Sequence, residues 1–222
     1  YKRVRKFMET EPAACSTVAK LVHALPIKTC NMIAHIRYAT CGGLRLENVH
    51  PFIRELWGNT WTFAHNGDLP RMCRSRCGFP LPFGPDEPFQ PIGDTDSEVA
   101  FCFIMNALHN RFPSGRPPLP VLYTTLEELC RELGSADGAI FNMLLSDGHT
   151  MIASSWPGSR PGSTVWNGLY YIVREAPFSV AHLADCDYSL DFSTITRPDD
   201  RIAMVVSKPL TTNERWIEFQ RG

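Results

Sequence analysis

The stretch TDSEVAFCFIMNALHN, residues 95–110, predicts a helix in the middle of the chain and sets the order of the elements around it. Thr95 followed by Glu98 forms a capping box, and the apolar residues that follow occupy a broad helical face. A second helix is predicted from Thr125 to about Leu133, where the Thr-x-x-Glu pattern recurs. Two helices therefore occupy the centre of the sequence.

Strand patterns lie on both sides of these helices. Before them, a short edge strand is predicted within residues 1–15, a helix is predicted after Ser16, and strands are predicted at residues 31–39 and 60–64. After them, short apolar runs separated by Asp-Gly, Asn-Gly and Pro-Gly pairs predict strands at residues 138–146, 150–154, 168–174, 178–181 and 201–207. Strands followed by helices and then by more strands favour an α+β fold with antiparallel sheets over βαβ winding. No domain boundary is evident, so we expect a single domain over residues 1–222.

Composition excludes several functional classes. The 222 residues carry a formal net charge of -1 and are 44% hydrophobic. The chain is therefore not disordered, and it lacks the basic excess that a nucleic-acid or membrane-surface binder needs. No apolar window approaches the roughly 18 residues of a membrane span. We expect no nucleic-acid partner and no membrane partner.

The eight cysteines show no paired spacing. A chain of this length does not need disulfides to fold, so we expect reduced thiols and a cytoplasmic location. Cys73 and Cys77, near His65, are the best candidates for metal ligands, but structural zinc needs four ligands that usually come in two close pairs. The sequence has no second pair, and we expect no metal and no cofactor.

Three clusters carry side chains suited to chemistry. Arg37 stands in the predicted strand of residues 31–39, where a guanidinium needs a substrate carboxylate or an internal salt bridge. Asn66 and Gly67 either present a side-chain amide and a backbone N–H to an oxyanion, or form a plain hairpin turn. Asp96 begins the central helix, where it either caps the helix or binds a cation. Together, a cation, an anion and an amide donor pair suit a free α-amino acid with a reactive side-chain carbonyl, and glutamine fits that description.

Five motifs in this order resemble the class II glutamine amidotransferases, which are N-terminal-nucleophile (Ntn) hydrolases. They are HIRYAT (35–40), LENVHPF (46–52), RELWG (54–58), WTFAHNG (61–67) and GDTDSE (93–98). The resemblance is closest to the stand-alone bacterial YafJ-like branch, which is related to the amidotransferase-like subunit of the fungal glutathione-degrading complex. The C-terminal stretch from residue 201 to 216 also resembles that branch.

The resemblance implies a four-layer αββα sandwich of two antiparallel sheets. It implies that Arg37 binds the α-carboxylate of a glutamine-like or γ-glutamyl substrate, with Thr40 and His50 beside it, and that Asp96 binds the α-ammonium. It further implies that Asn66 and the backbone amide of Gly67 form the oxyanion hole. Valine stands before His50 where the family often has threonine.

The nucleophile of the family is a cysteine at the mature N-terminus, and its own α-amine, with a pKa of about 7.7–8.0, serves as the base. Tyr1 cannot take this role. Family members also carry a strand and an Arg/Gly-rich segment before the matching residues, so we expect the N-terminal part of the domain to be missing and this chain alone to be inactive. Cys15 has no free amine and Cys41 suits a pocket wall, so neither replaces the nucleophile. The alternative is a catalytically dead subunit that binds an amino acid or acts as a scaffold for a partner peptidase.

Overall fold

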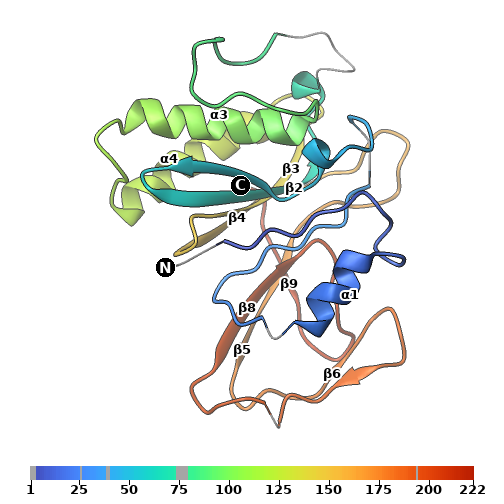
Figure 1. The fold of residues 1–222 in the computed structure, drawn as a ribbon. Coiled ribbons are helices and arrows are strands. Elements are labelled where there is room, and N and C mark those ends of the chain that lie inside the picture. Colours follow the sequence, from blue (N-terminus) through green and yellow to red (C-terminus); the bar gives the residue numbers. More distant parts are fainter. Residues whose placement is uncertain (1–3, 26, 39–40, 74–79, 194) are drawn as a thin grey trace.

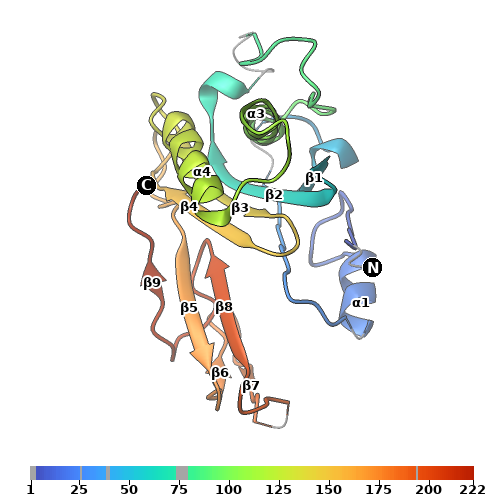
Figure 2. The ribbon, with the colours of Figure 1, turned by 90° about the vertical axis from the view of Figure 1, so that its left-hand side faces the viewer.

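The computed structural model describes residues 4–25, 27–38, 41–73, 80–193 and 195–222 (Figure 1). Its largest unit is a four-stranded antiparallel sheet in the order β1-β2-β3-β4. The strands are β1 (Phe52–Leu56), β2 (Asn59–Asp68), β3 (Ile140–Ser146) and β4 (Met151–Trp156). Helices α3 (Asp96–Arg111) and α4 (Leu119–Gly134) lie together on one face of this sheet, as Figure 2 shows. We call this unit the helix-covered sheet.

The main apolar core lies between these helices and the sheet. Phe63 of β2 stacks on Phe101 of α3 with ring centroids 5.0 Å apart, and both side chains are fully buried. Helix α4 contributes a stripe spaced by three or four residues, which is the spacing that places side chains on one helical face. Its members are all buried: Leu122, Leu126, Leu129 and Leu133. The structure confirms that a helix forms in each of the two predicted regions.

The first turn of α4 differs from its prediction. The helix begins at Leu119, with Pro120 in the first turn, where proline is tolerated because the N–H it lacks would have no helical partner. The predicted start at Thr125 is wrong: Thr125 is a buried residue inside the helix. The Thr-x-x-Glu pattern at that point is therefore not a cap.

A second sheet lies toward the C-terminus. Strand β5 (Tyr170–Glu175) pairs in antiparallel fashion with β8 (Arg201–Val206) on one side and β9 (Ile217–Glu218) on the other. We call this unit the C-terminal sheet. A small hairpin of β6 (Ala181–His182) and β7 (Ser189–Leu190) completes this part. The antiparallel α+β class is thus confirmed, although the sequence patterns do not predict β1, β7 and β9. Of the strand predicted at residues 178–181, only Ala181 lies in a strand, the two-residue β6.

The N-terminal region carries helix α1 (Thr17–Ala24), which is capped as predicted, because the Ser16 hydroxyl accepts the N–H of Ala19 at 2.7 Å. The strand predicted at residues 31–39 is wrong for its described part, since residues 31–38 form neither helix nor strand. The described residues 4–15 likewise form no strand. Apolar composition alone does not make a strand, because a strand also needs a neighbour to hydrogen-bond.

The turn predicted at Asn66 and Gly67 is also wrong, because β2 runs through both residues to Asp68. Asn66 lies opposite Asn142 of β3, and Gly67 lies opposite Phe141. The strand continues because its partner comes from more than 70 residues away, so no tight hairpin is needed at this point. Among the described residues, no helix has the length and apolar character to cross a membrane.

Candidate functional site

A pocket of about 440 Å³ opens beside the end of β2. Strand β1 pairs with β2 only as far as Phe63, whereas β2 runs on to Asp68. Beyond Phe63, this edge of β2 therefore has no strand partner among the described residues. The pocket is lined by His50 and by residues from four separate segments: 35–41, 65–67, 95–97 and 160–167. A larger hollow of about 690 Å³ lies at the β6–β7 hairpin, but it contains none of the residues predicted for the site.

The open edge of β2 presents its backbone to the pocket. The carbonyl of His65 accepts a hydrogen bond from Nε2 of His35 at 3.1 Å, and the carbonyl of Gly67 accepts one from Nη2 of Arg160 at 3.0 Å. Both donor side chains line the pocket. In a strand the N–H and C=O of one residue point to the same edge, and those of the next residue point to the other edge. The N–H of Gly67 therefore lies on the pocket edge of β2.

Asn66 lines the same part of the pocket with its side chain. Its Oδ1 is buried and has no hydrogen-bond partner among the described residues. A buried polar atom without a partner is costly, and one that lines a pocket points to a ligand group. At Gly67 a Cβ would come within 1.9 Å of the carbonyl oxygen of Ile140, so only glycine fits here. A side-chain carboxamide and a backbone N–H thus lie next to each other at the pocket.

Arg37 reaches the pocket from the segment before it. Its guanidinium donates to the carbonyls of Cys41 (2.6 Å), Gly42 (3.1 Å) and Gly43 (3.2 Å). In the part of the chain that the structure describes, no ion pair joins Arg37 to a carboxylate. Burial lowers the pKa of Arg37, while the negative charges of Asp94 and Asp96 raise it. Arginine has five donors and stays charged in proteins, so the positive charge is held by neutral acceptors and remains available to an anion.

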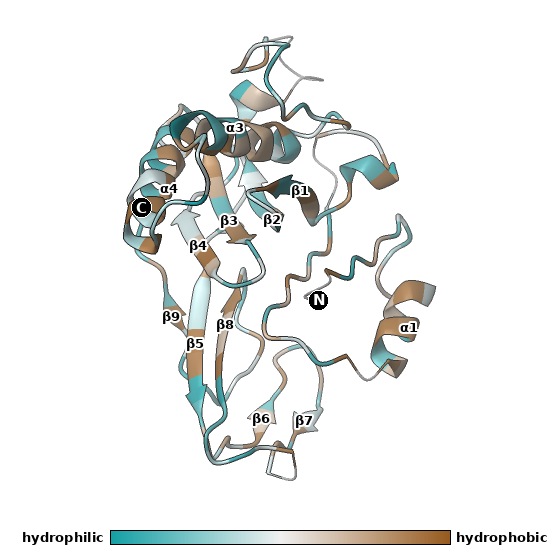
Figure 3. Cartoon of the chain, turned by 60° about the vertical axis from the view of Figure 1, so that its left-hand side comes forward, coloured by the Kyte–Doolittle hydropathy of each residue, from teal (hydrophilic) through white to brown (hydrophobic). Residues whose placement is uncertain are grey.

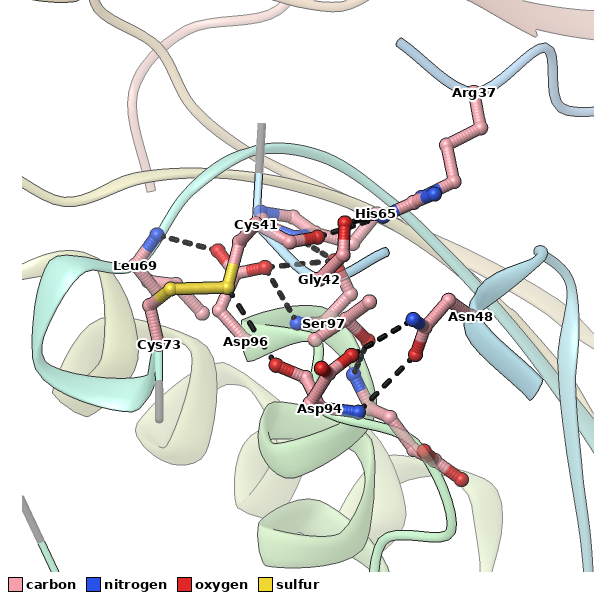
Figure 4. Close-up of a disulfide and its surroundings, with 12 residues drawn as sticks. Arg37, Cys41, Gly42, Asn48, His65, Leu69, Cys73, Asp94, Asp96 and Ser97 are labelled. Carbon is pink, nitrogen blue, oxygen red and sulfur yellow. Dashed lines mark hydrogen bonds between the residues drawn. A yellow bond between two sulfur atoms is a disulfide. The ribbon is translucent and has the colours of Figure 1, made fainter. Parts of the chain in front are cut away.

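A disulfide anchors the carbonyls that hold Arg37. Cys41 and Cys73 are bonded, as Figure 4 shows, and they connect the loop after residue 38 with the segment after β2. The expectation of reduced thiols is wrong for this pair, because the fold brings together two cysteines that are 32 residues apart. The predicted cytoplasmic location therefore loses that support. It also follows that Cys73 is not placed to bind zinc, and Cys77 lies outside the described residues.

The same loop is held by polar contacts. Asn48 donates through Nδ2 to the carbonyl of Gly43 at 3.0 Å and to Oδ1 of Asp94 at 2.7 Å. Gly42 has φ of 78°, and a Cβ there would come within 2.5 Å of the Asp94 carboxylate. This positive φ and this close approach both require glycine. The Cys-Gly-Gly sequence thus forms a tight turn that aims its carbonyls at Arg37.

Asp96 is the first residue of α3 and is 5% exposed. Its Oδ2 accepts the N–H of Leu69 at 2.8 Å, and its Oδ1 accepts the N–H of Ser97 at 2.9 Å (Figure 4). The N-cap is Thr95, whose hydroxyl accepts the N–H of Glu98 at 3.2 Å. The carboxylate of Asp96 is thus held rigidly at the pocket by backbone donors, and it has lone pairs left for a cation.

Three histidines lie beside these groups. His50 is 6% exposed, stacks on His35 with ring centroids 4.1 Å apart, and has no partner for either ring nitrogen among the described residues. Burial lowers the pKa of His50 well below its usual range, and burial lowers the pKa of His35 to about 4. His65 contacts the Ile140 carbonyl through Nε2 and the Ser97 hydroxyl through Nδ1, so Nε2 donates and Nδ1 accepts. Burial lowers the pKa of His65 as well. All three imidazoles are therefore neutral near pH 7.

The pocket thus contains nearly all of the predicted site. Five of the six residues line it, although they come from separate segments of the chain: Arg37, His50, Asn66, Gly67 and Asp96. Thr40 lies outside the described residues. Sequence reasoning missed the wall formed by Arg160, Ser163 and Asn167, because the loop between β4 and β5 showed only Pro-Gly and Asn-Gly turn signals.

None of the described cysteines is placed as a nucleophile for this pocket. Cys41 lines it but is held in the disulfide. Burial raises the pKa of Cys102 and of Cys130 to about 11, which keeps both as thiols. The remaining described cysteines are exposed and do not line the pocket: Cys15, Cys30 and Cys186.

A family model described as "Glutamine amidotransferases class-II" matches residues 1–222. The chain belongs to this family. It is 40% identical over 221 residues to "Putative glutamine amidotransferase YafJ" of Escherichia coli, covering all of this chain and 78% of that protein. It is 39% identical over 219 residues to a Haemophilus influenzae protein described as "Putative glutamine amidotransferase", covering 99% of this chain and 67% of that one.

A solved structure agrees with this assignment. The crystal structure of a "predicted glutamine amidotransferase" from Pseudomonas aeruginosa matches with a TM-score of 0.60 and 39% sequence identity. The match covers 79% of this chain and 60% of that one, so the chain spans less than two thirds of the solved amidotransferase. The mixed fold of helices and antiparallel sheets is therefore shared with a solved relative of the family.

Proposed function

We propose that the protein is a glutamine amidotransferase-type amidohydrolase, which attacks the side-chain amide of glutamine or the amide of a γ-glutamyl compound. One observation carries this proposal. A single pocket brings together a guanidinium bound by neutral carbonyls, a buried carboxylate and an adjacent pair of amide groups, which are supplied by Arg37, Asp96, Asn66 and Gly67. These are the groups that a zwitterion with a reactive side-chain carbonyl requires.

In this proposal the two charges of the pocket bind the amino-acid end of the substrate. Arg37 pairs with the α-carboxylate, because its planar fork matches a carboxylate and no carboxylate of the described chain neutralises it. Asp96 pairs with the α-ammonium. The family resemblance also assigns Thr40 and His50 to the carboxylate end of the substrate, and the neutral His50 ring serves as a hydrogen-bonding group without adding charge.

The reacting carbonyl then lies at the end of β2. The carboxamide of Asn66 and the N–H of Gly67 donate to the oxygen that becomes negatively charged in the tetrahedral intermediate. Such donors stabilise the transition state more than the ground state, because they meet the charge only as it develops. The fixed backbone of β2 holds both donors in place before the reaction begins.

We propose that the nucleophile is a cysteine at the mature N-terminus of the whole protein, outside residues 1–222. Its α-amine takes the thiol proton, the thiolate sulfur attacks the amide carbon, the C–N bond breaks, and the ammonium returns that proton so that glutamine loses its side-chain nitrogen as ammonia. Water then hydrolyses the γ-glutamyl thioester to glutamate and restores the thiol. This proposal is supported by the lack of a suitably placed thiol among the described residues.

The domain that carries this chemistry is proposed to comprise residues 1–222 together with that N-terminal segment, as a four-layer αββα sandwich in which two antiparallel sheets stack. The helix-covered sheet supplies one α and one β layer of such an arrangement. A glutamine-binding pocket without a thiol also favours a second candidate: a non-catalytic subunit that binds an amino acid or acts as a scaffold for a peptidase partner.

Ammonia release separates the two candidates. The whole protein with its N-terminal cysteine should hydrolyse glutamine, whereas residues 1–222 alone should release no ammonia above a heat-treated control. In the active protein, Asn66→Ala should lower kcat by about 10²–10³-fold and change KM little, because the lost donor acts mainly in the transition state. The variant must melt close to the parent. A whole protein that binds glutamine without releasing ammonia would favour the non-catalytic candidate, and full kcat in Asn66→Ala would remove Asn66 from the oxyanion hole.

A further inference from the structure

A row of polar side chains crosses the helix-covered sheet behind the pocket. Asn142 of β3 is 1% exposed within an otherwise apolar strand, and Ser155 of β4 is also 1% exposed. Asn66, Asn142 and Ser155 lie directly opposite one another on three neighbouring strands. Burying polar groups is costly unless their hydrogen bonds are made, and an apolar residue would serve the core equally well. The row therefore has a purpose other than packing.

The hydrogen bonds that Asn142 donates lead to the backbone of residues that line the pocket. Nδ2 of Asn142 donates to the carbonyl of Asn66 at 3.1 Å and to the carbonyl of Asn167 at 3.3 Å. Its Oδ1 accepts the hydroxyl of Ser155 at 2.8 Å. The carbonyls of Asn66 and Asn167 can only accept, so the amide end of the carboxamide faces them, and the Ser155 hydroxyl donates to the remaining Oδ1.

The carbonyl that Asn142 holds belongs to the same peptide unit as the N–H of Gly67. This unit is planar and trans, so its C=O and N–H point in opposite directions. Pairing of β2 with β3 already directs this carbonyl toward β3, and the Asn142 side chain adds a further hydrogen bond to it, which also holds the N–H toward the open edge of β2 and the pocket. The carbonyl on the other side of Gly67 is held by Arg160.

We propose that Asn142, supported by a hydrogen bond from Ser155, is a positioning residue that aims the Gly67 N–H at the developing oxyanion; this inference rests on the proposed function. Asn142 touches no reacting atom. Asn142 keeps the Gly67 N–H in place. Strand β2 has no strand partner on its pocket edge among the described residues, so without Asn142 it would hold this donor less firmly.

Kinetics of the whole protein test the proposal. Asn142→Ala should lower kcat of glutamine hydrolysis by about 10–100-fold with KM changed less than about threefold, because the donor is misdirected rather than removed. Ser155→Ala should lower kcat by a smaller factor. In the Asn142→Ala background, Ser155→Ala should have no further effect, because Ser155 acts only through Asn142.

The matched control is Asn106→Ala. Asn106 of α3 is also buried, at 3% exposed, and makes two hydrogen bonds, to the backbone N–H and carbonyl of Phe89. It does not line the pocket. Its loss should lower the melting temperature to a similar degree as Asn142→Ala and leave kcat unchanged. Equal kcat losses in Asn142→Ala and Asn106→Ala would overturn the proposal, and so would an unchanged kcat in Asn142→Ala. If Asn142→Ala does not fold, the kcat of Ser155→Ala decides in its place.

A second measurement is independent of turnover. In residues 1–222 labelled with ¹⁵N, glutamine should shift the amide signal of Gly67. Asn142→Ala should reduce that shift while the Kd for glutamine changes less than about threefold. A protein that binds glutamine but releases no ammonia would contradict the proposed hydrolysis. The Gly67 signal would still decide whether Asn142 positions this N–H. An unaltered shift in Asn142→Ala would overturn the role proposed for Asn142.

Discussion

The two sheets of this molecule have similar strand sequences but very different surroundings. Figure 3 shows hydrophobic stretches in β3 and in the middle of β5. In the helix-covered sheet the pattern is buried: Phe63, Phe141 and Leu145 have no exposed surface. In the C-terminal sheet, Val173 is 54% exposed and Ile202 is 43% exposed. Hydrophobic strands therefore do not reveal which sheet carries the core.

The C-terminal sheet depends instead on polar contacts. Arg174 of β5 forms two hydrogen bonds with Glu214, at 2.5 and 2.6 Å, and both side chains are largely buried. Thr211 donates to the same carboxylate and accepts the indole N–H of Trp216. One sheet is thus stabilised by apolar packing and the other by a charge network. The pocket takes its rigid groups from the first sheet and from the segments around it.

The largest expected effect comes from the core of the helix-covered sheet. Phe101→Ala should lower the free energy of unfolding by about 3–5 kcal/mol, because it removes a fully buried ring that stacks on Phe63. The matched change in the C-terminal sheet, Val173→Ala, should cost less than about 0.5 kcal/mol, since that side chain is more than half exposed. Urea unfolding of both variants measures the difference. Equal losses would show that the two sheets share one core.

A smaller effect is expected from the disulfide that links the Arg37 loop to the end of β2. The double variant with Cys41→Ser and Cys73→Ser should lose about 2–4 kcal/mol of stability, because the unfolded chain regains the freedom of the closed loop. Glutamine binding should also weaken, since the carbonyls of residues 41–43 that hold Arg37 are no longer anchored. The control is Cys15→Ser, which changes an exposed thiol. Thiol reagents should modify Cys41 and Cys73 only after reduction, and modification without a reductant would contradict the disulfide.

The smallest effect concerns the neutral histidines. Burial lowers the pKa of His35 to about 4, whereas the unfolded chain has a histidine pKa of about 6.5. The unfolded state therefore binds more protons between these values, so the stability that His35 contributes is present above about pH 6.5 and is lost as the pH falls toward 4. Burial lowers the pKa values of His50 and His65 as well, and the resulting loss of stability occurs in both proteins, so we expect the parent to lose about 1–2 kcal/mol more than His35→Gln between pH 7 and pH 5. If the two proteins show the same pH dependence, His35 is not buried as a neutral ring.

The sequence predicted the parts of the fold that local patterns determine. Helix α3 begins after its Thr95 cap and ends one residue beyond the predicted Asn110, because capping and apolar periodicity are local properties. The course of β2 could not be predicted. An Asn-Gly pair favours a turn locally, but Asn66 and Gly67 remain in the strand because β3, more than 70 residues later, pairs with them.

The candidate site shows the same division. The residue types at Arg37, Asn66 and Asp96, taken together, predict a class of substrate, because the chemistry of a side chain is visible in the sequence. Which distant segments come together in the fold cannot be read from the sequence alone. The Cys41–Cys73 disulfide and the contact of Arg160 with Gly67 both join segments that no local pattern connects. Asn142 could not be identified from the sequence for another reason, because a single asparagine within a mostly apolar strand forms no recognisable motif.

The central claim is that Arg37 and Asp96 bind the two charged ends of one amino acid. Calorimetric titration of residues 1–222 with glutamine, and with glutaramate, which has no α-amine, tests it directly. Asp96→Asn keeps the shape of the side chain and removes the charge, although its NH₂ end can no longer accept the N–H of Leu69 or of Ser97. It should weaken glutamine binding by about 100-fold or more, as expected when a buried ion pair loses one partner, and the glutaramate titration reports the effect of the lost backbone hydrogen bond. Glutaramate should bind the parent weakly and should be affected little by Asp96→Asn. Equal losses for both ligands, or no loss for either, would remove Asp96 from the ammonium site and contradict the account.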